Sequence, residues 1–456
     1  MAKVENKSFY KTLLQLAVPI TLQSLVMSLL FMTDQVMVGQ LGDTAIATVG
    51  IASKINSVVS VVLAGLAGAL SIYVAQYWGS KDRKSISQLL GLGLAIGLAL
   101  SLVFAAIIIA KPDLLLSLFT KDSSILSDGR IYLQIIAISF VPAMLTMLYS
   151  AMLRSTGHVK FPMYISLFTV ILNIVLNYLL IFGHFGLPKL GLAGSAYATL
   201  ISRVVESMLI IGSVYKYRLP GGTSLKELGS ISKPLANKFL ITMYPLVLTE
   251  LVWVLSEAVY AIIYSRMGTV EMTAMTITFP LQGLMIGLLT GISGAAAVMV
   301  GNKLGAGEPV IAQQYAKRLI RFGIAAAFVL GVVIALIAPL YTKLFQVSAE
   351  ADQLSVYILW VFAAFIWVKV ANMIMAGGVL QSGGDSKFVF AMESAATWLV
   401  GVPLGLLLSV VWKQPIFWVY FFLSLEELVR FVIGWQRLRS GKWVRNLTTS
   451  EESISA

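Results

Sequence analysis

The chain has 456 residues, of which 58% are hydrophobic and only 12% are charged, and its formal net charge is +12. Soluble domains carry about 25% charged residues, so this composition excludes a soluble globular protein. The lack of cysteine excludes disulfides and thiol chemistry, and two histidines, His158 and His184, are too few for a zinc centre.

Long apolar runs begin near the amino terminus and recur to the end of the chain. The run at 13–38 is too long for a cleaved signal peptide and has no small-residue cleavage motif after it, so it is expected to be the first span. Runs of about 20 residues can cross the hydrocarbon core as helices, and none alternates as the strands of a β-barrel do. Breaks at polar, Gly and Pro residues predict twelve spans, at approximately 13–38, 45–77, 87–110, 131–153, 161–183, 191–214, 239–265, 272–300, 319–340, 353–380, 388–410 and 415–436.

Lys and Arg are concentrated in the termini and in the even-numbered loops, and such basic residues favour the cytoplasmic side of a membrane. We therefore expect both termini in the cytoplasm and a multi-pass protein of the plasma (inner) membrane of a prokaryote. The positive charge is attributed to anionic membrane lipid at the inner surface, and not to nucleic acid. No obligatory protein partner is evident.

The longest cytoplasmic connection, at 215–238, contains Pro, Gly and five basic residues and is interpreted as a linker. It predicts an amino-terminal six-helix lobe at 1–214, a carboxy-terminal six-helix lobe at 239–440 and a cytoplasmic tail at 441–456. A constant shift of 226 residues places the following pairs on one another: Pro19 and Pro245, Gly42 and Gly268, Gly65 and Gly291, Gly68 and Gly294, Gly79 and Gly305. The fold is thus expected to be all-α, with two parallel six-helix repeats and a substrate cavity between the halves.

Several motifs follow one another along the chain: "LAVPITLQSLV" and "MTDQVMVGQLG" in span one, "YWGSKDR" and its counterpart "NKLGAGEP" after spans two and eight, "AMLRSTGHVKFPMY" after span four, and "LNIVLNYLLIFG" with "GLAGSAYATLISR" in spans five and six. Together they resemble the MATE family of multidrug and toxic compound extruders, in its prokaryotic form. The resemblance covers nearly the whole chain. It implies an antiporter rather than an enzyme, driven by H⁺ or Na⁺ without a cofactor, that alternates access between two lobes and exports mainly small organic cations.

Ionisable groups at membrane depth cost about 2.5 to 3.5 kcal/mol on insertion scales, so each is a candidate functional residue. Asp34 lies roughly 30 Å along span one from Leu13 and matches the acidic residue of the family's first span. Asn173 and Asn177 are one turn apart on one face of span five, and Thr199 falls at a similar level on span six. We predict that these four polar residues form the cation-coupling site; the alternative is that the asparagines only join helices by hydrogen bonds.

The coupling ion is predicted from a departure from the family pattern. Many family members carry an aspartate at the position of Asn177, so this chain has one less charge for a hard cation, which favours H⁺ over Na⁺. Lys54 in span two is a secondary candidate, because a permanent salt bridge to Asp34 would make that carboxylate structural.

The carboxy-terminal half has its own charges within spans. Glu250 and Glu257 are seven residues apart on one face of span seven, and Lys369 lies in span ten. An internal salt bridge between Lys369 and Glu250 is as well supported as a coupling role for either glutamate. All three residues are secondary candidates, together with Gln282.

A known carboxy-lobe cation site in branches of the family requires acids that this chain lacks. The positions that align with those acids are Trp253 and Ala371, which argues against the same site here.

Two other functions were weighed against antiport. A flippase for lipid-linked saccharides would line its cavity with several arginines to hold a diphosphate, whereas only Arg203 lies clearly within a span, where Glu206 is expected to neutralise it. A membrane enzyme would need His, Cys or paired acids at one depth, and no such constellation is visible.

Overall fold

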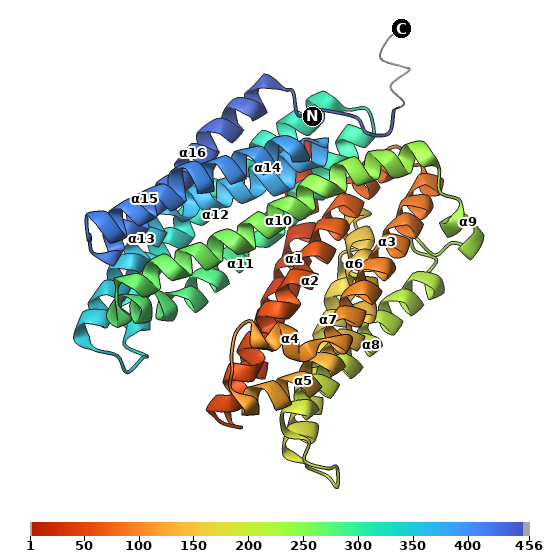
Figure 1. The fold of residues 1–456 in the computed structure, drawn as a ribbon. Coiled ribbons are helices and arrows are strands. Elements are labelled where there is room, and N and C mark those ends of the chain that lie inside the picture. The colour runs from red at the N-terminus through yellow and green to blue at the C-terminus, as the bar shows by residue number, and fades with distance from the viewer. Residues whose placement is uncertain (1, 450–456) are drawn as a thin grey trace. The chain divides into compact units, whose positions relative to one another are not determined.

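The structure is a computed structural model that describes residues 2–449, and within that range the chain is helical with no strand (Figure 1). The all-α prediction is confirmed. Residues 450–456 of the expected tail lie outside the described residues.

Twelve helical segments correspond to the twelve predicted spans. In chain order they are α1 (Ala2–Gly39), α2 (Asp43–Gly79), α3 (Arg83–Ala110), α5 (Ser123–Ile138) with α6 (Phe140–Ser155), α7 (Lys160–Phe182), α8 (Gly191–Lys216), α10 (Lys233–Met267), α11 (Thr269–Gly305), α12 (Pro309–Thr342), α13 (Ala349–Met373) with the π-helix η1 (Ile374–Leu380), α14 (Ser386–Ala395) continuing through η3 (Ala396–Gly401), α15 (Val402–Leu406) and η4 (Leu407–Val411), and α16 (Ile416–Ser440).

Three details go beyond the prediction. The span expected at 131–153 is the bent pair α5 and α6, whose axes differ by 42°. Two short helices, α4 (Pro112–Ser117) and α9 (Leu225–Gly229), lie in connections where no helix was expected. A single 3₁₀ turn, η2 (Gln381–Gly383), joins η1 to α14.

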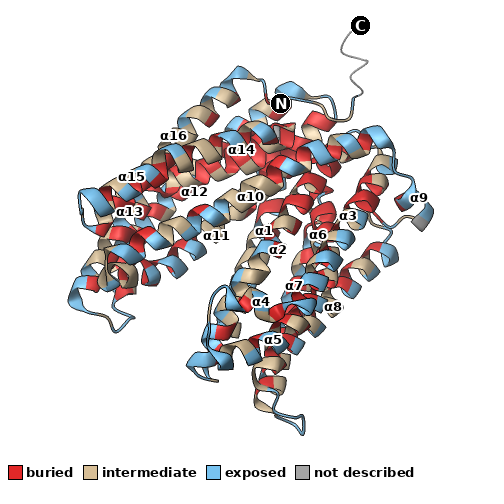
Figure 2. Ribbon diagram, viewed as in Figure 1, coloured by how far each residue is buried: buried red, intermediate tan, exposed pale blue. Residues whose placement is uncertain are grey.

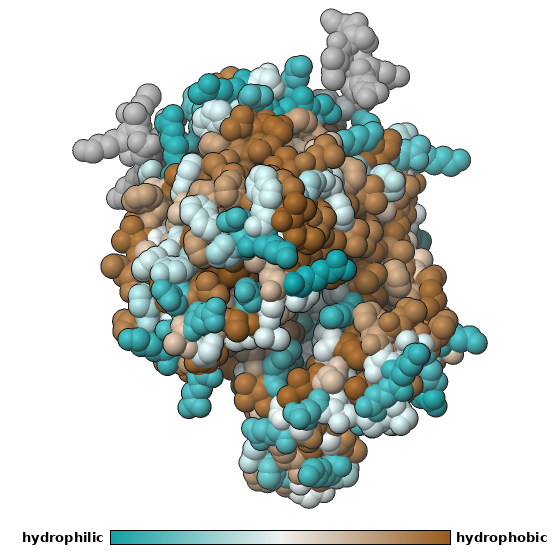
Figure 3. Space-filling view, turned by 60° about the vertical axis from the view of Figure 1, so that its left-hand side comes forward, coloured by the Kyte–Doolittle hydropathy of each residue, from teal (hydrophilic) through white to brown (hydrophobic). Residues whose placement is uncertain are grey.

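The helices present apolar side chains to their surroundings, as expected in lipid. In the described part of the chain, ten helices are long and apolar enough to cross a membrane, and the bent pair makes an eleventh segment. The remaining segment, α16, carries Glu426, Glu427 and Arg430 among its apolar residues. Hydrophobic side chains cover much of the face shown in Figure 3. On α12, for example, Phe328, Val332, Leu336 and Leu340 form an exposed stripe at four-residue spacing.

The chain divides into two compact units. One contains residues 22–74 and 82–247, and we call it the amino-terminal unit; the other contains, among the described residues, 2–21, 75–81 and 248–449, and we call it the carboxy-terminal unit. In the first, α8 packs against α5, α6 and α7; in the second, α13 packs against α11, α12 and α16. Figure 2 shows buried residues along the inward faces of these helices. The boundaries expected at 214, 239 and 440 stay predictions.

The first helix of each half is divided between the units two residues after its matched proline. Residues 2–21 of α1 group with the carboxy-terminal unit, and residues 233–247 of α10 group with the amino-terminal unit. Matched glycines permit α1 to pack on α11 and α10 to pack on α2, because a side chain at either position would clash. A Cβ at Gly291 of α11 would overlap the carbonyl oxygen of Ala17, and a Cβ at Gly65 of α2 would lie 2.8 Å from the Cα of Val247. We call this reciprocal arrangement the helix exchange.

Candidate coupling site and acidic cavity

Asp34, Asn173 and Asn177 come together in the amino-terminal unit. The amide nitrogen Nδ2 of Asn177 donates hydrogen bonds to Oδ1 of Asp34 at 2.5 Å and to Oδ1 of Asn173 at 2.9 Å. Both asparagines are buried on α7, whereas Asp34 on α1 is half-buried. The i, i+4 spacing on α7 places the two amides on one face, so that they meet the carboxylate of the facing helix.

One polar atom of this cluster is left without a partner. Oδ1 of Asn177 is buried and accepts no hydrogen bond. A buried carbonyl oxygen without a donor costs about 1 to 3 kcal/mol, so the cluster as it stands can gain one more hydrogen bond.

The other predicted residues of this half lie apart from the cluster. Thr199 is half-buried on α8, which packs against α7, but among the described residues no hydrogen bond joins it to Asp34 or the asparagines. Lys54 is exposed on α2, and no ion pair joins it to Asp34 in the described part of the chain. The structure therefore gives no support to the salt-bridge interpretation of Asp34.

Arg203 and Glu206 do not form the expected ion pair; each binds a serine instead. Nη1 of Arg203 donates to Oγ of Ser139 at 3.0 Å, and Glu206 accepts from Oγ of Ser166 at 3.0 Å. Gln23 on α1 donates to the same Ser166 at 3.0 Å. Because α8 packs against several helices, Arg203 and Glu206 find partners on other elements. Spacing along one helix cannot predict such partners.

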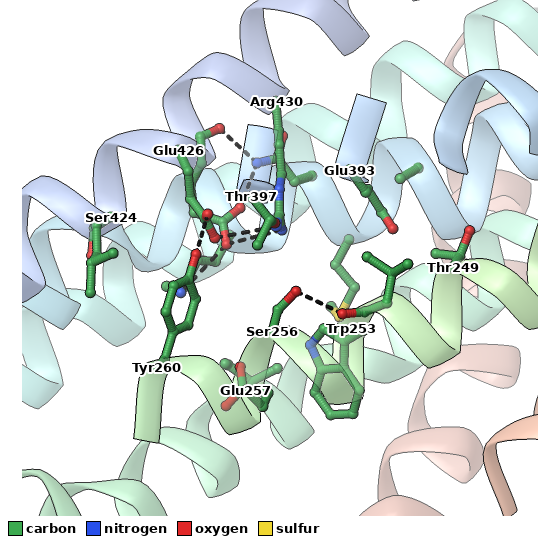
Figure 4. Close-up of a pocket in the computed structure, with 18 of the residues that line it drawn as sticks. Thr249, Trp253, Ser256, Glu257, Tyr260, Glu393, Thr397, Ser424, Glu426 and Arg430 are labelled. Atoms are coloured by element: carbon green, nitrogen blue, oxygen red, sulfur yellow. Dashed lines mark hydrogen bonds and ion pairs between the residues drawn. The ribbon is translucent and has the colours of Figure 1, made fainter. Parts of the chain in front are cut away.

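The carboxy-terminal unit contains a cavity of about 680 Å³. This volume is within the range of about 300 to 1,000 Å³ for small-molecule sites. Helices α10, α11, α13, α14 and α16 and the π-helices η1 and η3 supply its walls (Figure 4). Five glutamates and two basic residues line it: Glu250, Glu257, Glu393, Glu426, Glu427, Lys369 and Arg430. We call this space the acidic cavity.

One end of the acidic cavity is a network of paired charges. Arg430 contacts Glu426 at 3.2 Å and Glu427 at 3.6 Å, and Lys369 contacts Glu427 at 3.5 Å. Tyr260 donates to Glu426 at 2.6 Å, as Figure 4 shows. Glu426 and Glu427 thus have their charges compensated, and this end of the cavity is held together by the spacing of α16 residues at i, i+3 and i+4.

Lys369 therefore pairs with Glu427 on α16 and not with Glu250, as one interpretation of the sequence proposed. Gln282 is also fixed within the wall, since its Oε1 accepts from the Tyr420 hydroxyl at 2.8 Å and its Nε2 donates to Thr278 at 3.0 Å.

The other three glutamates of the cavity differ from this network. In the described part of the chain no hydrogen bond or ion pair joins Glu250, Glu257 or Glu393 to another residue. Glu250 and Glu257 line the cavity from α10, and Glu393 does so from α14. Their carboxyl groups line the cavity without a hydrogen-bond or ion-pair partner among the described residues.

Four charged residues of the cavity, Glu393, Glu426, Glu427 and Arg430, were not predicted as site residues from the sequence. Three of them could have been, because Glu426, Glu427 and Arg430 are charged residues in the middle of the last apolar segment. Arg430 also corrects the statement that only Arg203 lies clearly within a span. No cluster of three or more metal-ligating His, Asp or Glu side chains occurs in the part of the chain that the structure describes.

The fold and the candidate sites are those of a multi-pass membrane transporter. The chain has twelve helical segments in two repeats with apolar outer faces, and it contains a carboxylate at membrane depth and a drug-sized cavity. The sequence profile of the MatE family matches residues 19–179 and, again, residues 245–407. The chain therefore belongs to the MatE family, whose members are transporters and not enzymes. Both matches begin at the prolines that the internal repeat aligns.

Individual relatives agree with this assignment. An uncharacterized transporter of Bacillus subtilis, YisQ, is 24% identical over 98% of this chain and 97% of its own length. A probable multidrug resistance protein NorM of Halalkalibacterium halodurans is 27% identical over 88% of this chain and 87% of its own. A mutant of the Vibrio cholerae MATE transporter VcmN superposes with a TM-score of 0.88 at 20% identity, covering 96% of this chain and 99% of that one. The two-lobe, twelve-helix fold is thereby confirmed.

Proposed function

We propose that this protein is a secondary antiporter that exports small organic cations in exchange for H⁺, with Asp34 as the proton-carrying residue. The observation that carries the proposal is the hydrogen bond from Asn177 to Asp34 inside the amino-terminal unit. The name of the NorM relatives, which refers to multidrug resistance, agrees with export of varied compounds.

The cluster can hold a proton in a defined way. When Asp34 is protonated, its hydroxyl becomes a donor. Oδ1 of Asn177 is buried without a donor, so it can accept a hydrogen bond from that hydroxyl once the amide has turned over. When Asp34 is ionised, the observed bond from Nδ2 stabilises the carboxylate. One amide thus serves both protonation states, and loss of the proton couples to a change in its orientation.

The same geometry favours H⁺ over Na⁺. A hard cation needs several free oxygen ligands. Here the Asn177 nitrogen lies between the oxygens of Asp34 and Asn173, within 2.5 and 2.9 Å of them. An N–H donor therefore occupies the place that a metal ion would take.

The remaining parts of the proposal follow from the family and the charge pattern. In this proposal, access to the substrate alternates between the two lobes. The protein resides in the plasma membrane, with both termini in the cytoplasm, because Lys and Arg are concentrated in the termini and even-numbered loops.

The test is efflux of ethidium from proteoliposomes that contain the purified protein, under an imposed pH gradient or an imposed Na⁺ gradient. Asp34→Asn should reduce efflux driven by the pH gradient by about tenfold or more, a loss of about 1.4 kcal/mol of coupling. Asp128→Asn, which changes an exposed aspartate in the same unit, should transport like the wild type.

Other outcomes would point elsewhere. Transport driven by Na⁺ alone would overturn the choice of coupling ion. Undiminished efflux by a folded Asp34→Asn variant would remove Asp34 from the mechanism. No transport under either gradient would favour the saccharide flippase.

A further inference from the structure

The acidic cavity contains more carboxyl groups than the protein pairs with basic side chains. Five glutamates face two basic residues along its walls. Lys369 is engaged with Glu427, and Arg430 is engaged with both Glu426 and Glu427. The carboxyl groups left without a basic partner are therefore those of Glu250, Glu257 and Glu393.

Two of these carboxylates have a fixed spacing. Glu250 and Glu257 are seven residues apart on α10, which places them on one face and about 10 Å apart along the helix axis. Trp253 lies between them on that face and also lines the cavity. An aromatic ring between two carboxylates provides a surface for the alkyl chain of a cation and for a cation–π contact.

The third carboxylate and an amide come from other helices. Glu393 points from α14 towards α10 in Figure 4 and lies within electrostatic range of Glu250. Asn372 of α13 is 6% exposed, and its Nδ2 donates to Glu427 at 2.8 Å. Its Oδ1 is buried and accepts no hydrogen bond. Asn372 thus holds Glu427 in place within the cavity wall.

These groups share one chemical property: all of them are hydrogen-bond acceptors. Ionised carboxylates and amide oxygens accept and cannot donate, so their natural ligand carries N–H groups. A single positive charge would leave two carboxylates uncompensated. A divalent metal ion is a poor match, since its ligands must lie within about 2.6 Å of one centre, whereas no compact metal-binding group exists among the described residues.

We propose that the acidic cavity binds an organic cation with at least two protonated primary or secondary amino groups, in the manner of a linear polyamine. One ammonium group binds Glu250 and Glu393, the second binds Glu257, and the chain between them lies along Trp253. This inference deepens the proposed function, on which it rests for the transport of such a ligand, by assigning a substrate class and a place within the carboxy-terminal unit.

The test is isothermal titration calorimetry of the purified full-length protein with three probes. Spermidine supplies several separated ammonium groups, butylamine supplies one, and hexamethonium supplies two positive charges without N–H donors. Spermidine should bind about tenfold more tightly than either other probe. The difference from butylamine measures the need for a second charge, and the difference from hexamethonium measures the need for donors.

Variants locate the site. The triple variant Glu250→Gln, Glu257→Gln, Glu393→Gln should lose about tenfold or more in spermidine affinity. Glu350→Gln, which alters an exposed glutamate of the same unit, should bind like the wild type. Size-exclusion profiles and thermal unfolding show whether each variant is folded, and the single variants replace the triple one if it is not.

Equal affinity for spermidine and butylamine, unchanged binding by the triple variant, or no measurable binding of spermidine would each overturn the inference. Asp34→Asn separates this inference from the proposed function. If that variant binds spermidine normally but no longer exports ethidium, both stand. If it still exports ethidium while the glutamate variants lose spermidine, the coupling proposal fails and the polyamine site stands. If it loses ethidium export while the glutamate variants bind spermidine normally, the coupling proposal stands and the polyamine site fails.

Discussion

The two units differ in the partners that they provide for ionisable side chains. At the candidate coupling site of the amino-terminal unit, the carboxylate of Asp34 binds the amide of Asn177, which also binds Asn173, so this ionisable group has a neutral partner. The carboxy-terminal unit places five carboxylates around a cavity and compensates two of them with Lys369 and Arg430. A lone carboxylate with an adjustable amide suits the gain and loss of one proton, whereas a surplus of fixed negative charge suits attraction of a cation.

The largest effect should come from breaking the charge network at α16. Arg430→Met removes the cation that serves both Glu426 and Glu427, and uncompensated buried charges cost about 3 to 5 kcal/mol. We expect a marked fall in the thermal unfolding temperature of the detergent-solubilised protein, partly restored by Glu426→Gln in the same chain.

The matched control is an ion pair at the surface. Arg130 and Asp113 are both about half exposed, and such pairs contribute about 0 to 1 kcal/mol. Arg130→Met should therefore leave the unfolding temperature nearly unchanged. Equal effects of the two arginine substitutions would show that the α16 network is as weakly stabilising as a surface pair.

The next effect concerns the choice of ion at Asp34. Asn177→Asp adds a second carboxylate where an amide now binds Asp34, and two carboxylates are a better site for a hard cation. Ethidium efflux by this variant should be stimulated about threefold by an inward Na⁺ gradient, a change of less than 1 kcal/mol. Asn446→Asp, in the carboxy-terminal segment, should show no such stimulation. Absence of stimulation in Asn177→Asp would mean that charge at this position does not determine the ion.

The smallest effect should follow from removing one of several equivalent charges. Glu257→Gln leaves Glu250 and Glu393 in the acidic cavity, so efflux of monovalent ethidium should fall by about threefold at most. The measurement is the same proteoliposome assay, beside Asp34→Asn. A loss as complete as that of the Asp34 variant would contradict the division of roles between the two units.

The sequence was sufficient for the parts that depend on periodicity within one helix. Twelve apolar segments, the repeat and the pairing of Asn173 with Asn177 follow from spacing, and depth along α1 brings Asp34 to the same level. Pairings between helices could not be predicted this way. Lys369 binds Glu427 rather than Glu250, and Arg203 binds Ser139 rather than Glu206, because the packing of α13 on α16 and of α5 on α8 decides which side chains meet.

The acidic cavity illustrates a second limit. Glu393 belongs to α14, just before the helix continues as the π-helix η3. A π-helical turn rotates the residues after it relative to an α-helical register, so the face that Glu393 shares with them changes. Apolar periodicity in the sequence gives no sign of this rotation. Glu426 and Glu427 were within reach of sequence reasoning, but their roles depend on Arg430 and Tyr260, which approach from different directions.

The helix exchange has a consequence for how the chain is made. Thr21 of α1 donates its hydroxyl to the carbonyl of Leu288, at a sequence separation of 267 residues. Synthesis proceeds from the amino terminus, so the first segment to emerge waits in the membrane until most of the chain has been translated. Completion of the carboxy-terminal unit therefore depends on the residues made first. A protein cut within the 215–238 connection would need both fragments in one bilayer before either unit could be complete.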